Sequence, residues 1–206
     1  MLDSKIHDAF ETGNWDFVKD LLEKEEIEDI DDIDDNEMTL LMFVCIADRL
    51  DMVEILLRQN VNIEAADCDG WTSLMYACSS GHLKIVEFLL GRGANIEATS
   101  KPDKMYTPLY IASLARSPEI VEFLLQKGAD IEVKCYQSGK TPLYTAACNN
   151  NVDIVKILIL SGADTEIKTT NGRGYLHYVR EQSIIDQYKE CEKSVRYRNI
   201  KPAVKP

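Results

Sequence analysis

The residues best suited to chemistry lie between Glu23 and Glu37, where ten of the fifteen positions are Asp or Glu. Carboxylates at this density suggest either a metal-binding loop or an acidic interaction segment. A calcium loop needs alternating oxygen ligands, a glycine at its sixth position and a glutamate at its twelfth, and no frame of this stretch supplies that set. We therefore predict that the stretch holds no metal.

A nucleophilic enzyme would need a base within hydrogen-bond reach of its nucleophile, and histidine is the usual base. The chain has three histidines, His7, His82 and His177, which are widely spaced in the sequence. The segments NGRG at Asn171 and GRGA at Gly91 lack the spacing and the lysine of a phosphate-binding loop. The sequence thus predicts no enzyme and no cofactor. The alternative is an unrecognised active site, which a deep concavity joining His82 or a cysteine to a carboxylate would favour.

The cysteines form no CxxC pair and have no histidine pairs nearby, a pattern that disfavours both a zinc site and a disulfide framework. They are Cys45, Cys68, Cys78, Cys135, Cys148 and Cys191. The first residues lack a cationic start followed by an apolar block, and no apolar run approaches the roughly 18 residues that span a bilayer. We expect reduced thiols in an intracellular, cytoplasmic protein that has no membrane partner.

The net charge of −12 is concentrated at one end of the chain. Residues 1–37 contain fifteen Asp or Glu and three Lys, so this segment carries −12 and residues 38–206 sum to zero. Nucleic acid is a disfavoured partner, because phosphate contacts require a basic face. The apolar fraction of 45% is that of a globular protein, and 206 residues suit one core or a short repeat array.

The elements that would position these residues repeat along the chain. The clearest copies are DGWTSLMYACSSGHLKIVEFLLGRGANIEA from Asp69, MYTPLYIASLARSPEIVEFLLQKGADIEV from Met105 and GKTPLYTAACNNNVDIVKILILSGADTEI from Gly139. The equivalent threonines, spaced by 33, 35 and 34 residues, are Thr39, Thr72, Thr107 and Thr141. Weaker copies, IHDAFETGNWDFVKDLL and GRGYLHYV, flank them. The period predicts six units, which start near residues 4, 34, 67, 102, 136 and 169, with the outer two degenerate.

Each unit is predicted to be a pair of short helices. The threonine before the first helix can accept a bond from a free backbone N–H, and Pro108 and Pro142 suit the first turn. The second helix presents one apolar stripe, as at Ile85, Val86, Leu89 and Leu90. A glycine in the left-handed conformation would then end this helix, at Gly93, Gly128 and Gly162. One pair cannot bury its stripe alone, so stacked neighbours must supply the missing surface.

The repeated pattern, G-x-TPL-x-x-A and then xIVxxLLxxGAxIE, resembles the ankyrin repeat over residues 4 to about 185. The resemblance implies an all-α solenoid of about six helix-turn-helix units, with β-hairpin-like finger loops between units and degenerate capping units at both ends. Residues 1–185 would form a single domain, followed by a helical end and a basic flexible tail over residues 186–206. A short recognition peptide is the alternative for the tail.

The resemblance also implies a structural role for the histidines. His82 takes the Gly-His position after the first helix, where the family's histidine bonds loop backbone, and His7 and His177 take the family's first-helix histidine position. Asn60 replaces a usual glycine, and Arg116 replaces the glycine of Gly-His. We expect these departures to weaken single helix caps and to leave the fold intact.

A partner protein would contact residues that vary between units while the framework repeats. In the fingers these candidates are Met38, Asp69, Trp71, Lys104, Tyr106, Ser138, Lys140, Asn171 and Arg173. On the inward face of the first helix they are Met42, Met75, Tyr110 and Tyr144. The alternative for Trp71 and Tyr106 is that they cover the flank of the adjacent finger, and the alternative for the first-helix column is bonding within the stack. Aromatic residues and arginine dominate binding energy when an interface desolvates them.

The sequence therefore predicts a non-catalytic protein–protein interaction module that is monomeric alone and binds a partner by its finger tips and concave first-helix face. The alternative is an inhibitor or effector that blocks or redirects a host or target enzyme by the same surface. The repeat register aligns Asp31 with Glu64, Glu97 and Glu132, so the acidic stretch is interpreted as the first connection between units. Its charge and the cations near the other end predict a polarised surface that steers one orientation of a partner.

Overall fold

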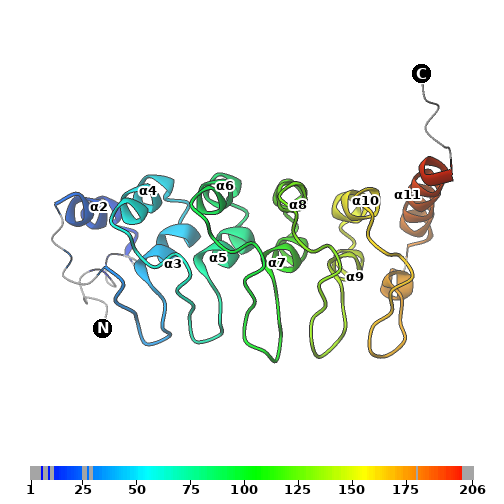
Figure 1. The fold of residues 1–206 in the computed structure, drawn as a ribbon, viewed down its shortest axis with the longest axis horizontal. Coiled ribbons are helices and arrows are strands. Elements are labelled where there is room, and N and C mark those ends of the chain that lie inside the picture. The colour runs from blue at the N-terminus through cyan, green and yellow to red at the C-terminus, as the bar shows by residue number, and fades with distance from the viewer. Residues whose placement is uncertain are drawn as a thin grey trace, which may run out of the picture. The chain divides into compact units, whose positions relative to one another are not determined.

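The structure is a computed structural model that describes residues 6, 9, 12–24, 27, 30–179 and 181–200. His7 and the last six residues lie outside the described part. The chain divides into two compact units, Met1–Lys101 and Pro102–Pro206. Within each unit, short helices alternate with loops that project from them (Figure 1). The described residues form no extended strand, only isolated bridges, so the predicted all-α repeat architecture is confirmed.

The helices are seven to nine residues long except at the C-terminal end. Unit 1 contains α2 (Trp15–Glu23), α3 (Leu40–Ile46), α4 (Leu50–Arg58), α5 (Ser73–Ser80) and α6 (Leu83–Gly91). Unit 2 contains α7 (Pro108–Ala115), α8 (Pro118–Gln126), α9 (Pro142–Cys148), α10 (Val152–Leu160), the 3-10 helix η1 (Tyr175–Tyr178) and α11 (Gln182–Ile200). Helices this short are marginal in isolation, so packing between neighbours must hold them.

Threonine caps begin the first helix of most repeats. The Oγ1 atoms of Thr39, Thr107 and Thr141 accept the backbone N–H three residues on, at 3.4, 3.3 and 3.3 Å. Thr72 has the same extended backbone, but its buried hydroxyl has no hydrogen-bond partner within the described structure. The predicted cap is therefore confirmed at three of the four threonines.

The second helices end at a left-handed residue, as the sequence predicts. Gly93, Gly128 and Gly162 follow the C-cap directly and have φ of +92°, +89° and +97°. Asn60 takes the same role at φ 60°, and Arg116 ends α7 at φ 63°. Asparagine visits this region more readily than most residues, whereas arginine bears the full steric cost of its Cβ.

The core of each unit is a layer between first and second helices. In unit 1, α3 packs on α4 and α5, and α5 packs on α6. In unit 2, α7 packs on α8 and α9, and α10 packs on α9 and α11. Cys45 and Cys78 are fully buried, and burial raises the pKa of both thiols, so they behave as small apolar side chains.

Carboxylates tie successive loops together. A side chain in the loop after one second helix accepts a backbone N–H from the loop one repeat later. The bonds run from Asn62 to Asp31 at 2.9 Å, from Asn95 to Glu64 at 2.8 Å and from Asp164 to Glu132 at 2.6 Å. The alignment of Asp31 with Glu64 and Glu132 is confirmed, and part of the acidic stretch belongs to the framework. Desolvation raises the pKa of Glu132, although the bond from Asp164 opposes that shift.

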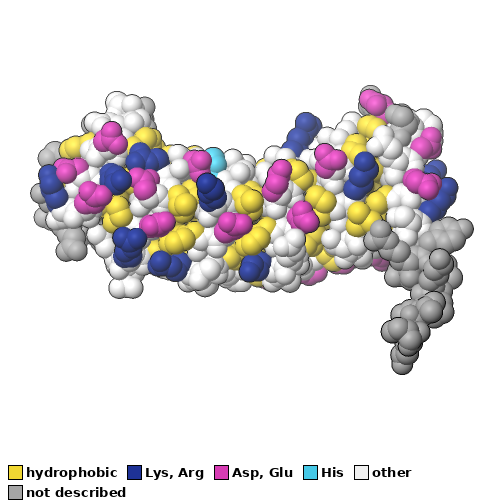
Figure 2. Space-filling view, turned by 90° about the horizontal axis from the view of Figure 1, so that it is seen from above, with side chains coloured by type: hydrophobic (Ala, Val, Ile, Leu, Met, Phe, Trp, Pro, Cys, Tyr) yellow, Lys and Arg dark blue, Asp and Glu magenta, His cyan; other side chains and the backbone are white. Residues whose placement is uncertain are grey.

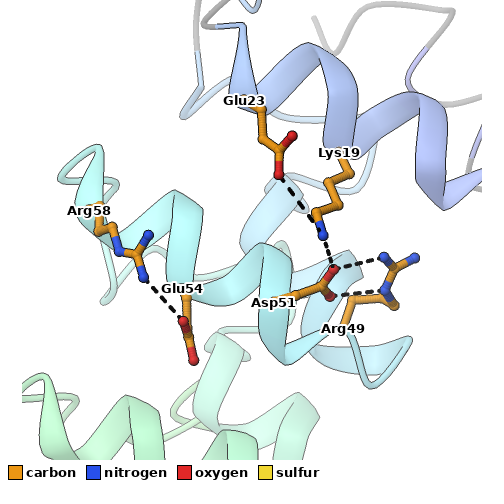
Figure 3. Close-up of polar contacts among 6 residues, drawn as sticks. All are labelled: Lys19, Glu23, Arg49, Asp51, Glu54 and Arg58. Carbon is orange, nitrogen blue, oxygen red and sulfur yellow. Dashed lines mark hydrogen bonds and ion pairs between the residues drawn. The ribbon is translucent and has the colours of Figure 1, made fainter.

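An ion-pair network joins α2 to α4 (Figure 3). Arg49 donates to both carboxylate oxygens of Asp51, with both N···O distances 3.0 Å, and the ammonium of Lys19 lies 3.0 Å from Asp51 Oδ2. The hydrogen bonds from Arg49, more than those from Lys19, lower the pKa of Asp51 to about 2. This bidentate arrangement favours the ionised carboxylate.

Replacing Asp51 with asparagine is expected to remove a pH-dependent part of the stability. Because the folded pKa of about 2 lies below the ordinary 3.8, ionised Asp51 stabilises the fold above about pH 4, and this contribution is lost as the pH falls toward 2. The side chain is 40% exposed, so solvent screening reduces the contribution to about 1 kcal/mol. Urea unfolding of wild type and variant across this pH range should give curves that converge at the acid end.

The control is Glu54→Gln, which removes the more exposed pair between Glu54 and Arg58, 3.2 Å apart on the same helix. We expect this variant to follow the wild type within a few tenths of a kcal/mol at every pH. A loss as large as that of Asp51→Asn, or a difference for Asp51→Asn that persists at pH 2, would contradict the assignment.

At the C-terminal end of unit 2, Tyr188 of α11 and Tyr175 of η1 lie in contrasting environments. The Tyr188 side chain is fully buried and its hydroxyl has no hydrogen-bond partner within the described structure. Tyr175, whose ring centroid lies 6.2 Å from that of Tyr188, donates its hydroxyl to the Glu192 carboxylate. Burial raises the pKa of Tyr188 to about 12, so the hydroxyl keeps its proton and still lacks an acceptor.

Tyr188→Phe is therefore expected to raise the free energy of unfolding by about 1 kcal/mol, because an unpaired buried hydroxyl leaves while the ring remains. Tyr175→Phe, the matched variant, should lower it by about 1 kcal/mol, because Glu192 loses its donor. Denaturant midpoints would distinguish the two. Equal losses in both variants would mean that the Tyr188 hydroxyl has a favourable partner.

Candidate protein-binding surface

Four of the fingers are tight turns closed by backbone hydrogen bonds. The residue that enters the turn donates its N–H to a carbonyl four or five residues later. These bonds join Asp34 to Met38 at 3.1 Å, Asp67 to Trp71 at 3.0 Å, Cys135 to Lys140 at 3.0 Å and Thr169 to Arg173 at 2.9 Å. Four sequence candidates, Met38, Trp71, Lys140 and Arg173, thus lie where the chain leaves the turn.

A left-handed residue shapes every turn, three positions before the helix begins. It is a glycine in three fingers, Gly70, Gly139 and Gly172, with φ of +78°, +63° and +72°. Glu37 and Met105 occupy the same position at φ 63° and 53°. Glycine adopts this conformation without a steric penalty, so these two side chains are held in a costly backbone at the tips of their fingers.

Neighbouring fingers within a unit are also joined along their backbones. The N–H of one finger donates to a carbonyl of the finger before it. In unit 1 the bonds join Cys68 to Asn36 and Lys101 to Asp69, both at 2.9 Å. In unit 2 they join Tyr136 to Lys104 at 3.2 Å and Thr170 to Ser138 at 3.1 Å. Because four fingers are closed at their own turns and the fingers of each unit are bonded to their neighbours, their side chains stand on a preorganised framework.

Side chains reinforce the turns, differently in the two units. In unit 1, Asp34 Oδ1 and Asp67 Oδ1 each accept the N–H groups two and four residues on, at 2.8 to 2.9 Å. In unit 2, hydroxyls replace these carboxylates. Ser138 Oγ accepts the N–H two residues on at 3.4 Å, and Thr169 Oγ1 accepts the N–H four residues on at 3.2 Å. The unit 2 fingers are thereby built without buried acidic groups.

In unit 1 the finger candidates are only partly accessible. Trp71 is half-buried, and its ring is tilted by 49° against that of Tyr76, with centroids 5.3 Å apart. Tyr76 in turn donates its hydroxyl to Asp67 Oδ2, and burial raises its pKa. Met38 is half-buried and Asp69 is exposed. Trp71 therefore rests on its own repeat and leaves only part of its ring to solvent.

In unit 2 the candidates combine cations with tyrosine rings. Tyr106 stacks on Tyr110, with centroids 4.8 Å apart and planes within 5° of parallel. The Lys140 ammonium lies 5.6 Å from the ring centroid of Tyr144. Lys104, Tyr106, Ser138 and Lys140 are half-buried, and Asn171 and Arg173 are exposed. A cation over a ring face is attracted by the ring quadrupole, which orders the ammonium of Lys140.

The first-helix column differs from the surface that the sequence led us to expect. Met42 and Met75 have no exposed area, and Tyr110 and Tyr144 are 4% and 3% exposed. These positions follow the cap by three residues, on the side of the helix that the finger and neighbouring helices cover. In the free protein Tyr110 supports the ring of Tyr106 and Tyr144 lies beneath the Lys140 ammonium, and none of the four side chains offers a contact surface of its own.

Three exposed large apolar side chains of the fingers were not among the sequence candidates. Tyr136 is 70% exposed, Ile33 is 40% exposed and Met105 is 37% exposed. Tyr136 aligns with Cys68, Lys101 and Thr170, on the limb that enters the finger turn. The column that contains Trp71 and Lys140 lies on the limb that leaves it. A single large aromatic in a column of smaller or polar residues was the signal that could have identified it.

The opposite face, formed by the second helices, has a mixed character. Figure 2 shows Lys and Arg interspersed with Asp and Glu among apolar side chains there. Cations also lie over two of its rings: Arg92 is 4.6 Å from the Phe88 centroid and Lys127 is 5.4 Å from that of Phe123. Alternating signs and covered rings make this face less suited to a charged or aromatic partner than the fingers.

The described residues contain no group of three or more His, Cys, Asp or Glu side chains that could hold a metal ion. His82 serves the framework: its Nε2 lies 3.1 Å from the Ile46 carbonyl and its Nδ1 lies 3.5 Å from Asp48 Oδ1. None of the six cysteines, all within the described residues, forms a disulfide bond. Over the described ranges, no helix combines the length and apolar character needed to cross a bilayer.

Comparison with known sequences recovers the same repeats. A family model described as ankyrin repeats in three copies matches residues 6–100 and residues 98–169. Together the two matches span α2 to α10 and the finger loops between them. No curated protein matches the chain.

Proposed function

The chain belongs to the ankyrin-repeat family, and from this premise we propose that it is a non-catalytic module that binds a partner protein through its finger tips. Ankyrin repeats are generally protein–protein interaction modules and typically non-catalytic. The proposed contact residues are the nine finger candidates, Met38, Asp69, Trp71, Lys104, Tyr106, Ser138, Lys140, Asn171 and Arg173, together with Tyr136. Met42, Met75, Tyr110 and Tyr144 act beneath them as supports.

One observation carries the proposal: accessible aromatic and charged finger side chains stand on backbones that are already fixed. Four of the turns are closed internally, and neighbouring fingers within each unit are bonded to one another. Binding then orders few additional groups, so more of the contact energy appears as affinity. Trp and Tyr are also the side chains in which interface energy concentrates. The finger loops thus combine rigidity with the residue types that suit recognition.

The test is affinity capture with the full chain as bait, comparing wild type with Trp71→Ala/Tyr106→Ala. We expect recovery of the partner to fall by more than about tenfold, because each residue is expected to contribute over 1 kcal/mol. The control is Leu160→Ala, which removes a side chain of similar apolar character that is 49% exposed on α10, away from the fingers. Circular dichroism would establish that the variants keep their helices.

Undiminished capture by the finger variant, or an equal loss in Leu160→Ala, would overturn the assignment of the binding surface. We further propose that the free chain is monomeric and that its charged finger loops bind a different protein. Light scattering over a range of concentrations measures this directly, and a stable dimer of the free chain would refute it.

A further inference from the structure

The fingers of the two units carry opposite charge. Residues 33–39 and 66–72 of unit 1 contain five Asp or Glu and no Lys or Arg. We call residues 102–107, 134–141 and 168–174 the unit 2 finger patch. Its charged residues are Lys104, Lys134, Lys140, Lys168, Arg173 and one carboxylate, Asp103. The patch therefore has a local charge of about +4 on a chain whose total is −12.

The patch also has the most exposed aromatic side chain among the large apolar groups of the described chain. Tyr136 is 70% exposed, and its N–H donates to the Lys104 carbonyl at 3.2 Å, which sets the two fingers side by side. Met105, 37% exposed, follows Lys104 directly at the tip. Cationic and apolar contact groups thus lie within one loop pair. An occupant must present both anionic and apolar groups to use them.

Two lysines of the patch, Lys104 and Lys140, lie close to tyrosine rings. Lys140 has its ammonium over Tyr144, and Tyr106 stacks on Tyr110 one repeat earlier. Burial is the largest cause of the raised pKa of Tyr106, and the charge of Lys104 opposes it, which places that charge near the ring. An ordered ammonium beside a partly desolvated ring attracts a carboxylate more strongly than one in open water.

We propose that the unit 2 finger patch binds an extended acidic segment of the partner protein, with Asp or Glu carboxylates on Lys104 and Lys140 and an apolar side chain on Tyr136. This inference rests on the proposed function and specifies the chemistry of its partner. The backbones of neighbouring fingers are already hydrogen-bonded to one another. Recognition therefore uses the finger side chains, and the acidic segment need not pair with the finger backbone as an additional strand.

Charge distinguishes such a segment from a nucleic acid. A long polyanion responds to the whole chain, whose net charge of −12 repels it. A short segment with a few carboxylates responds mainly to charges within a Debye length, about 8 Å at physiological salt. The patch itself contains five cations and one carboxylate. The apolar contact with Tyr136 further favours a peptide, which can alternate acidic and apolar side chains.

The experiment measures binding of three labelled probes to the full chain by fluorescence anisotropy. The probes are a glutamate–leucine peptide, its lysine–leucine counterpart and an oligouridylate long enough to extend well beyond the patch. We expect the acidic peptide to bind most tightly and its affinity to fall as salt rises. The variant Lys104→Glu/Lys140→Glu should weaken that affinity by about tenfold or more. Tyr136→Ala should weaken it too, with the salt dependence unchanged, because it removes an uncharged contact.

The matched control is Lys84→Glu/Lys127→Glu, which makes the same change in net charge at exposed positions outside the fingers. It should bind the acidic peptide within about twofold of wild type. Equal losses in the two double variants, no preference for the acidic over the basic peptide, or tighter binding of the oligouridylate would each overturn the inference. Concentration-dependent self-association that Lys104→Glu/Lys140→Glu abolishes would also overturn it, by making a second copy the occupant.

The inference and the proposed function can fail separately. If capture of the partner depends on Trp71 and Tyr106 but is unaffected by Lys104→Glu/Lys140→Glu, the acidic segment is wrong and the finger surface stands. If capture is indifferent to both sets of variants, the finger surface itself is wrong. Both variants would be compared at the same salt concentration, because charge reversal changes association as well as affinity.

Discussion

Replacing Gly70 with alanine is expected to lower the free energy of unfolding by about 3 kcal/mol. Gly70 lies in the left-handed region at φ +78°, where a Cβ atom is strained by about 1 kcal/mol. A Cβ there would also lie 2.6 Å from the Lys101 backbone nitrogen and 3.0 Å from the Ser100 carbonyl carbon. These are backbone atoms of the next finger, so relief requires the bond from Lys101 to Asp69 to stretch or break.

Gly172→Ala is the matched control for this prediction. Gly172 occupies the same turn position at φ +72°, but a Cβ added there would meet no described atom within 4 Å beyond its chain neighbours. It should lose only the conformational cost, about 1 kcal/mol. Urea denaturation followed by circular dichroism measures both variants. If the two variants lose the same free energy of unfolding, the neighbouring finger yields to the added Cβ and the fingers do not form a rigid framework.

Asp67→Ala is expected to cost about 3 kcal/mol and to weaken partner binding as well. The Asp67 carboxylate is buried and accepts three hydrogen bonds, from the N–H groups of Asp69 and Trp71 and from the Tyr76 hydroxyl. Alanine leaves three donors in a partly buried turn without their acceptor. Because Tyr76 contacts the Trp71 ring, the indole also loses its support.

Asp67→Asn tests whether geometry or charge matters. Its carbonyl oxygen can still accept both N–H groups, and its amide can donate to the Tyr76 oxygen, so we expect a loss of about 1 kcal/mol. Denaturant titrations give the stabilities, and capture of the partner reports on Trp71. An alanine variant as stable as the asparagine variant would show that water replaces the carboxylate and that the turn is solvated.

Features fixed within one repeat were predictable from the sequence. The left-handed glycines after the second helices follow from local rules, as does the cap at Thr107, because each depends on residues a few positions away. The hydrogen bond from the Asp164 N–H to Glu132 could be predicted because the repeat register aligns the Glu132 carboxylate with Asp31. Six units and a domain boundary at residue 185 stay predictions.

Features that depend on what covers a residue were not predictable. Met75 and Tyr144 vary between repeats as contact residues do, but the finger above and the helix beside them bury both. Variation along a column does not reveal which side of the helix the next repeat occupies. Tyr136 is exposed where the others are buried, and it was not predicted because its accessibility depends on the path of its finger limb at the turn. Its exposure follows from the loop path, which the helical period does not encode.

The carboxylate links between connecting loops and the backbone links between fingers point the same way along the chain. Carboxylates of Asp31, Glu64 and Glu132 accept N–H groups from residues made later, and each backbone bond between neighbouring fingers runs from an N–H to a carbonyl made earlier. During synthesis on the ribosome, the acceptor of each of these links therefore exists before its donor emerges. A newly made repeat can dock on a finished one without waiting for the rest of the chain, which suits a fold whose stability is built between nearest neighbours.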